Sequence, residues 1–320
     1  MLPLEKVSVI LVSKDRPEYL QDALESLVVQ KKYIKEILIF DKSEQLDHIE
    51  RIKNLSTLYN ATLFLRPSTL NTSTLRNEGI QVAQGEFLCF LDDDDYLFPN
   101  YMERQLSYLQ NGISLVFCNY ITIKHPEHPV QIQPLQKRYA GLIQARTWTA
   151  ALAFRYGALS IRRNAFAFIA TFIPIIHGAM FRKDALDKIR FSDQMVFCED
   201  LHFWILFYKN KLSMEFNNSV LAIYRIHESN WSSLFTAKHN LEFYSSLLSE
   251  GAVSGKVNYF ILLLKILKFS RWGQFLENSQ KKILLNALWN RISLLPYILL
   301  VFPYYITLKY QNNQSGKSLK

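Results

Sequence analysis

The sequence predicts an α/β fold in which a mostly parallel sheet carries helices on both faces. Short apolar runs alternate with segments of helical periodicity over about the first 120 residues, and this alternation is typical of parallel strands joined by crossover helices. Polar or acidic residues directly follow three of the apolar runs. Ligands of such sheets bind beyond the carboxyl ends of the strands, so these residues are expected to form one site.

The expected elements follow one another closely along the chain. The uncharged run 7–12 is typical of a central strand. Pro17 suits the first turn of the next helix, whose apolar positions fall on one face. Further strands are expected at 36–40, 62–65, 87–91 and 115–120, and further helices around 49–55, at 73–83 and at 201–208.

Four consecutive aspartates, Asp92 to Asp95, follow the strand expected at 87–91. Adjacent carboxylates repel one another, which raises their pKa values unless a cation or the solvent offsets the repulsion. One interpretation is a solvated turn. The other is a Mg²⁺ or Mn²⁺ site that holds a diphosphate, because hard oxygen ligands suit these ions. The nearby strand ends at 13–14 and Asp41 favour the second interpretation.

Composition and motifs exclude several classes of protein. Hydrophobic residues make up 49% of the chain and charged residues 20%, which indicates a globular protein. Cys89, Cys118 and Cys198 have no paired spacing and are interpreted as reduced core residues. No Gly-x-Gly-x-x-Gly follows the first strand and no P-loop motif occurs, so neither a dinucleotide-binding domain nor a P-loop domain is expected.

Several motifs occur in a fixed order. They are the runs 7–17 and 36–43, then Leu75-Arg76-Asn77-Glu78-Gly79, then the stretch from Gly85-Glu86-Phe87 through the aspartates to Pro99. Together they resemble the N-terminal half of family 2 glycosyltransferases, which are inverting GT-A enzymes that use nucleotide-sugar donors. The resemblance implies a hexosyltransferase-type activity (EC 2.4), a divalent metal cofactor (Mn²⁺ or Mg²⁺) and a role in polysaccharide biosynthesis.

By this resemblance, residues at the strand ends bind the nucleotide sugar, with a UDP-sugar favoured as donor. The donor-binding residues that the resemblance implies are Val12, Ser13, Lys14, Asp41, Arg76 and Asp93. Taken alone, Asp41 is better explained as a turn or capping residue. The alternative for Arg76 is a surface residue of its helix. The family usually carries other residues at Lys14, Asp15 and Lys42, so the nucleobase stays open.

The resemblance also implies metal ligands and a general base. The implied metal ligands are Asp92, Asp94 and His227, and Asp95 is expected to cap the next turn. A metal and a nearby arginine would neutralise the charge that develops on the departing nucleoside diphosphate. Asp200 is implied to deprotonate the acceptor hydroxyl. The alternative is that this aspartate caps the following helix, since helix N-termini favour acids.

The second half of the chain gives weaker indications. Residues 122–171 hold seven basic residues and one acid and match no motif. A basic, aromatic lining favours a phosphate-bearing acceptor such as a lipid-linked sugar or another glycan, and a helical pair packed on the sheet is the alternative. We expect a catalytic domain at 1–250, with its donor half at 1–120 and its acceptor and catalytic half at 121–250, and a helical tail at 251–320.

The predicted tail carries the net positive charge of the chain. Residues 251–320 contain ten Lys or Arg and one acid, which accounts for the net charge of +9. Lys265, Lys268 and Arg271 share a helical face opposite apolar residues, as in helices at a membrane interface. We expect a cytoplasmic protein, peripheral on the inner face of the membrane; a cap over the catalytic domain is the alternative. No nucleic-acid partner is expected, because the charge is remote from the predicted site.

Two other functions are alternatives to a glycosyltransferase. A nucleotidyltransferase of related fold normally has a glycine-rich basic loop after the first strand, and residues 13–17 contain no glycine. A catalytically inactive nucleotide-sugar-binding module would retain the donor pocket alone. The presence of both Asp94 and Asp200 favours an active glycosyltransferase over this binding module.

Overall fold

The computed structural model describes residues 4–124 and 175–230, apart from positions 188, 196 and 229, and also Phe166, Ile169, His239, Phe243, Tyr244 and Leu247. Most of these residues belong to one of two compact units of the chain, Met1–Ala151 with Thr171–Leu234. The predicted tail at 251–320 and most of the basic stretch at 122–171 lie outside the described residues. Among the helices that are described, none combines the length and apolar character needed to cross a bilayer.

Strands and helices alternate strictly in the first half of the sheet. The elements are β1 (Val7–Ser13), α1 (Pro17–Val28), η1 (Lys31–Tyr33), β2 (Ile34–Asp41), α2 (Leu46–Leu58), β3 (Thr62–Leu65), α3 (Thr72–Val82) and β4 (Phe87–Asp92). Strand β1 pairs in parallel with both β2 and β4, and β2 pairs in parallel with β3. The predicted strands and helices of this half are confirmed.

The second half completes an eight-stranded sheet of order β3-β2-β1-β4-β7-β6-β8-β5. Its elements are β5 (Tyr96–Leu97), α4 (Tyr101–Leu109), β6 (Leu115–Lys124), η2 (Ile176–Gly178), β7 (Ala179–Arg182), η3 (Lys183–Leu186), α8 (Glu199–Lys209) and β8 (Met214–Ile226). Strand β7 runs antiparallel to both β4 and β6, whereas β6 and β8 are parallel. The mostly parallel α/β class is confirmed. Helix α4 and strands β5, β7 and β8 were not predicted from the sequence; β5 and β7 are too short to show a periodicity.

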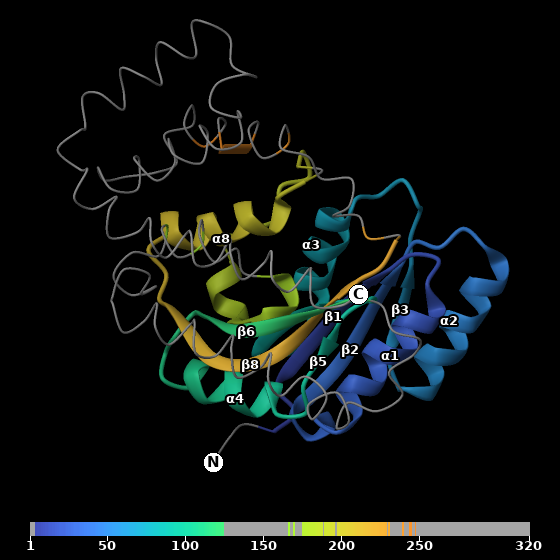
Figure 1. The fold of residues 1–320 in the computed structure, drawn as a ribbon, viewed down its shortest axis with the longest axis horizontal. Coiled ribbons are helices and arrows are strands. Elements are labelled where there is room, and N and C mark those ends of the chain that lie inside the picture. Colours follow the sequence, from blue (N-terminus) through green and yellow to red (C-terminus); the bar gives the residue numbers. More distant parts are fainter. Residues whose placement is uncertain are drawn as a thin grey trace, which may run out of the picture. The chain divides into compact units, whose positions relative to one another are not determined.

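Helices cover both faces of the sheet, with α1, α2 and α4 on one side and α3 and α8 on the other (Figure 1). On the first side Leu20, Leu24 and Leu27 of α1 are buried in a core with alternate residues of β1 and β4. On the second side Phe191 stacks on Phe203 of α8, with 3.9 Å between ring centroids. Both rings also pack edge-on against Phe90 of β4, which holds α8 over the strand that leads to the aspartates.

The two motif glycines serve packing between elements. A Cβ atom on Gly79 of α3 would lie 2.5 Å from Cγ2 of Ile10 in β1, and one on Gly85 would lie 2.6 Å from the backbone nitrogen of Ser8. A side chain at either position would therefore push a helix or strand away from β1. The first glycine sets how closely the helix that carries Arg76 approaches the sheet.

Candidate active site

Three strand ends meet at one edge of the sheet. In the parallel registers Ser13 lies opposite Asp41, and Val12 lies opposite both Phe40 and Asp92. The first turn of α1 and the turn after β4 therefore start from adjacent positions. The structure brings the strand ends together as the order of elements predicts.

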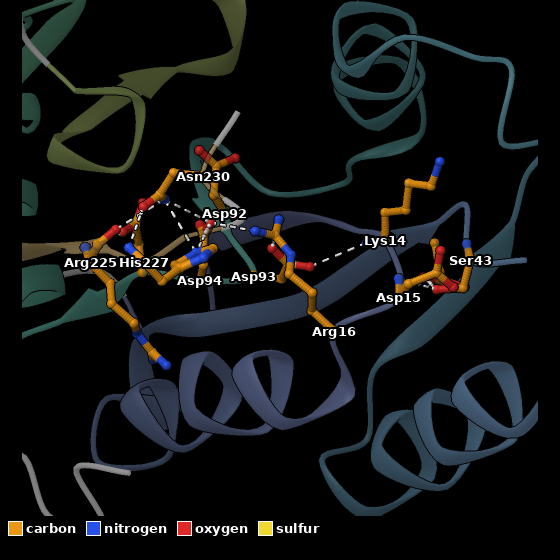
Figure 2. Close-up of polar contacts among 12 residues, drawn as sticks. Lys14, Asp15, Arg16, Ser43, Asp92, Asp93, Asp94, Arg225, His227 and Asn230 are labelled. Atoms are coloured by element: carbon orange, nitrogen blue, oxygen red, sulfur yellow. Dashed lines mark hydrogen bonds and ion pairs between the residues drawn. The ribbon is translucent and has the colours of Figure 1, made fainter. Parts of the chain in front are cut away.

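The turn after β4 is buried, and the loop after β1 supplies its counter-charge. The side chain of Asp93 is fully buried and that of Asp94 is 10% exposed. Arg16 donates to Oδ1 of Asp93 at 2.5 Å and to Oδ2 of Asp94 at 2.6 Å. The backbone N–H of Lys14 donates to the other oxygen of Asp93 (Figure 2). One guanidinium thus bridges two adjacent carboxylates.

His227 and Asn230 reach Asp94 from the segment after β8. Nε2 of His227 lies 2.9 Å from Oδ2 of Asp94, and the side-chain amide of Asn230 lies 3.5 Å from the same oxygen (Figure 2). Burial opposes ionisation of Asp94, but the hydrogen bond with His227 and the charge of Arg16 outweigh it and lower its pKa to about 2. Asp94 is therefore ionised at neutral pH.

Asp95 points away from the turn that follows it. Its Oδ1 accepts a hydrogen bond from the backbone N–H of Arg225 in β8. Its Oδ2 lies 2.9 Å from Nδ1 of His177, an ion-pair contact between two side chains that are each 1% exposed. Burial raises the pKa of Asp95 to about 6, although the charge of His177 opposes the rise. The expectation that Asp95 caps the next turn is wrong, because its oxygens bind β8 and η2.

Arg76 joins the aspartates to the N-terminus of α8. Its guanidinium donates to Asp92 at 2.7 Å and to Glu199 at 3.1 Å, and its side chain is 4% exposed. The same group lies over the rings of Phe90 and Phe191. The structure therefore places Arg76 in the buried interior and excludes the interpretation as a surface residue.

Asp200 is the second residue of α8 and follows Glu199, which pairs with Arg76. Its Oδ1 accepts a hydrogen bond from the backbone N–H of Leu201, and the residue before the helix, Cys198, has a left-handed backbone with φ of 60°. Burial, followed by the charge of Glu199, raises the pKa of Asp200 to about 7, while Arg76 opposes the rise. A carboxyl that titrates near neutrality is suited to accept a proton from a hydroxyl.

The remaining predicted donor residues line the ends of β1 and β2. Ser13 is buried, and the side chain of Lys14 extends away from the aspartates (Figure 2). Both oxygens of Asp41 accept hydrogen bonds from Ser43. Ser43 in turn accepts the backbone N–H of Asp15, which ties the loops after β1 and β2 together. This geometry allows the turn interpretation of Asp41, so its contact with a nucleobase stays a prediction.

Comparison with known proteins identifies the family. The model of the family described as glycosyl transferase family 2 matches residues 8–190. The chain belongs to this family. It is 23% identical over 226 residues to the uncharacterized glycosyltransferase MJ1057 of Methanocaldococcus jannaschii, a match that covers 69% of this chain and 70% of that protein. A match of 29% identity to EpsH of Bacillus subtilis covers 36% of this chain but only 33% of EpsH.

A solved structure agrees with this assignment. The crystal structure of S. aureus TarS 1-349 in complex with UDP-GlcNAc matches with a TM-score of 0.57 at 16% sequence identity, over 97% of this chain and 92% of that chain. At this identity the likeness shows the fold. The sheet order and the family match together confirm the predicted GT-A architecture.

A divalent cation fits the acidic turn of this family 2 glycosyltransferase. Within the described part of the chain, Asp92, Asp95 and His177 offer ligand atoms that lie within 4.8 Å of one another. The ring nitrogen of His177 that faces this cluster is Nδ1, 2.9 Å from Oδ2 of Asp95, and it is the atom that would serve as a ligand. Carboxylate oxygens suit hard divalent cations such as Mg²⁺ and Mn²⁺. This set shares only Asp92 with the predicted ligands, and the predicted Asp94 and His227 also contact each other directly.

Three members of this site were not predicted from the sequence, namely Arg16, His177 and Asn230. Arg16 carried a usable signal, because a basic residue in the loop after the first strand lies at the same sheet edge as the acidic run. Asn230 carried none, since it lies 136 residues from the aspartate that it contacts. His177 was likewise invisible, because its partner is fixed only when β7 inserts beside β4.

Proposed function

We propose that this glycosyltransferase transfers a sugar, with inversion, from a nucleoside-diphosphate donor to a hydroxyl group of a glycan or lipid-linked acceptor. One observation carries the proposal. Arg76 contacts both Asp92 at the acidic turn and Glu199, the neighbour of Asp200. The turn suited to a diphosphate and the carboxyl suited to a proton therefore belong to a single site.

In this proposal the two parts of the site act on opposite sides of the anomeric carbon. Asp200 accepts the proton of the acceptor hydroxyl while that oxygen forms its bond to the anomeric carbon. The bond to the departing phosphate oxygen breaks, and its electron pair leaves with the nucleoside diphosphate. A general base of this kind contributes about a hundred- to ten-thousand-fold in rate. Attack from the face opposite the leaving group inverts the configuration.

The acidic turn is proposed to hold the leaving group. Asp92, Asp94 and His227 would hold Mn²⁺ or Mg²⁺, which, when bound, supplies Lewis-acid stabilisation of the developing diphosphate charge. Arg76 adds a fixed positive charge beside this turn. A UDP-sugar is the preferred donor, and the UDP-GlcNAc complex of the structurally similar TarS supports testing it first.

The test is a transfer and hydrolysis assay with UDP-, GDP- and dTDP-sugars, each with Mn²⁺ or Mg²⁺. Wild type should consume one donor in a metal-dependent reaction, and Asp94→Asn should lose both metal dependence and most activity. Asp187→Asn, at an exposed aspartate of the same unit, is the matched control. Equal donor binding by wild type and Asp94→Asn, whatever the metal, would refute the metal assignment.

We further propose a catalytic domain at 1–250 and a tail at 251–320 that binds the inner face of the membrane. Its basis is the excess of basic residues in the tail, because anionic lipids attract such segments. The test is flotation of the full chain with anionic liposomes beside a variant that carries Glu at Lys265, Lys268 and Arg271. Equal recovery of both proteins in the soluble fraction would contradict the proposal.

A further inference from the structure

Arg16 occupies the solvent side of the two aspartates that it bridges. Its side chain is 27% exposed, whereas that of Asp93 is fully buried and that of Asp94 is 10% exposed. Arg16 belongs to the loop before α1, and its guanidinium reaches the two aspartates from that loop (Figure 2). A cation that approaches these carboxylates from solvent therefore meets Arg16.

Oδ2 of Asp94 is already crowded in this arrangement. Arg16 lies at 2.6 Å, His227 at 2.9 Å and the amide of Asn230 at 3.5 Å from this one oxygen. An arginine side chain stays protonated in proteins. It therefore cannot make room for a second cation by losing its charge, and relief has to come from movement or from an arriving anion.

The neighbouring rim of the site is also positively charged. The side chain of Lys42, which donates to the carbonyl oxygen of Leu70, is partly buried. Its pKa is lowered by burial and then by the charges of Lys14, Arg76 and Arg16, although the charge of Asp93 opposes the shift. Such mutual repulsion favours an anionic ligand over a free metal ion at this edge.

We propose that Arg16 acts as the resident counter-ion of Asp93 and Asp94 and opposes metal binding until a nucleoside diphosphate arrives. The diphosphate brings negative charge that offsets both Arg16 and the metal, so the two ligands bind in a mutually dependent manner. This inference rests on the proposed metal-dependent function and adds a residue that couples the metal to the donor.

The experiment measures Mn²⁺ binding by isothermal titration in the full chain, first with MnCl₂ alone and then with saturating UDP, GDP or dTDP in separate runs. A unit charge about 5 Å from a divalent ion, even with water-like screening, changes a dissociation constant about tenfold. We expect Arg16→Gln to bind Mn²⁺ alone about tenfold more tightly than wild type. The enhancement by the nucleotide should shrink by the same factor.

Two variants make the result specific to this charge. Arg16→Lys keeps the positive charge and should bind Mn²⁺ within about threefold of wild type, since the charge rather than the forked geometry opposes the metal. Arg66→Gln removes the charge of an arginine that pairs with Glu78 outside the turn, and it should behave as wild type. Circular dichroism confirms that each variant is folded. If Arg16→Gln does not fold, Arg16→Met, which also removes the charge but keeps a long side chain, takes its place with the same expected tightening.

The outcomes separate the two proposals. Three results would overturn the role of Arg16 and leave the metal-dependent function standing. They are equal Mn²⁺ affinity in wild type and Arg16→Gln, an equal increase of Mn²⁺ affinity in Arg16→Gln and Arg16→Lys, and no increase of Mn²⁺ affinity by any nucleotide in wild type. No Mn²⁺ binding by any folded variant, with or without nucleotide, would refute the metal-dependent function itself.

Discussion

Replacing Asp200 with Asn is expected to stabilise the protein at alkaline pH while it removes most of the transfer activity. In the folded chain, burial and the neighbouring Glu199 raise the pKa of Asp200 from 3.8 to about 7. In the unfolded chain the same carboxyl is surrounded by water and has a pKa of about 4. Folding therefore disfavours the ionised form, and the native protein carries that cost whenever this carboxyl is charged.

The sign and the pH window follow from these two pKa values. Below about pH 4 the carboxyl is protonated in both states and contributes nothing. Between about pH 4 and pH 7 the unfolded state loses its proton first, so the free energy of unfolding of wild type falls as the pH rises. Above about pH 7 both states are ionised and the full cost is present. A pKa difference of about three units between the folded and unfolded states corresponds to about 4 kcal/mol. Because the side chain is half-buried and solvent screens part of the cost, we expect about 2 to 4 kcal/mol.

The assay is urea unfolding at pH 5 and at pH 8.5, followed by circular dichroism, for wild type, Asp200→Asn and the exposed control Asp187→Asn. The difference between Asp200→Asn and wild type should reach about a third of its full size at pH 5 and should grow to about 2 to 4 kcal/mol at pH 8.5. The control should show no such growth. In parallel, Asp200→Asn should lose about a hundred- to ten-thousand-fold in transfer rate, as expected for loss of a general base.

Two results would refute the reasoning separately. If the stability difference is the same at both pH values, then burial does not raise the pKa of Asp200 in the folded protein. If Asp200→Asn retains full transfer, this residue is not the base, whatever its pKa. A stabilised but inactive variant would support both statements, because a residue held for structure alone would not be inactive when the fold is strengthened.

Three further predictions concern the rest of the site. Arg76→Gln should shift the acidic limb of the pH–rate profile to higher pH, because the charge of Arg76 opposes the rise in the pKa of Asp200. An unchanged acidic limb would contradict an electrostatic interaction between Arg76 and Asp200. Asp94→Asn should abolish Mn²⁺ binding in titrations with nucleotide while Asp95→Asn should retain it; the opposite pattern would favour the ligand set that contains Asp95. Gly85→Ala should lower the free energy of unfolding by about 1 to 3 kcal/mol through the clash with β1, and an unchanged melting temperature would argue against the close approach.

The sequence was informative where its signals are local. Apolar runs and helical periodicity predicted β1 to β4 and the helices between them, since each signal lies within a few residues. The meeting of Ser13, Asp41 and Asp92 also followed, because parallel strands bring their carboxyl ends to one edge. It failed for β7, whose antiparallel insertion between β4 and β6 depends on distant partners.

The four aspartates show the division most clearly. The sequence determined that Asp92 to Asp95 follow a buried strand and form the acidic part of a site. Only the tertiary structure made them different: the pKa of Asp94 is about 2, while those of Asp93 and Asp95 are about 7 and 6. The physical reason is that burial and charged partners set these values. Those partners come from the loop after β1, from η2 and from the segment after β8, all remote in the sequence.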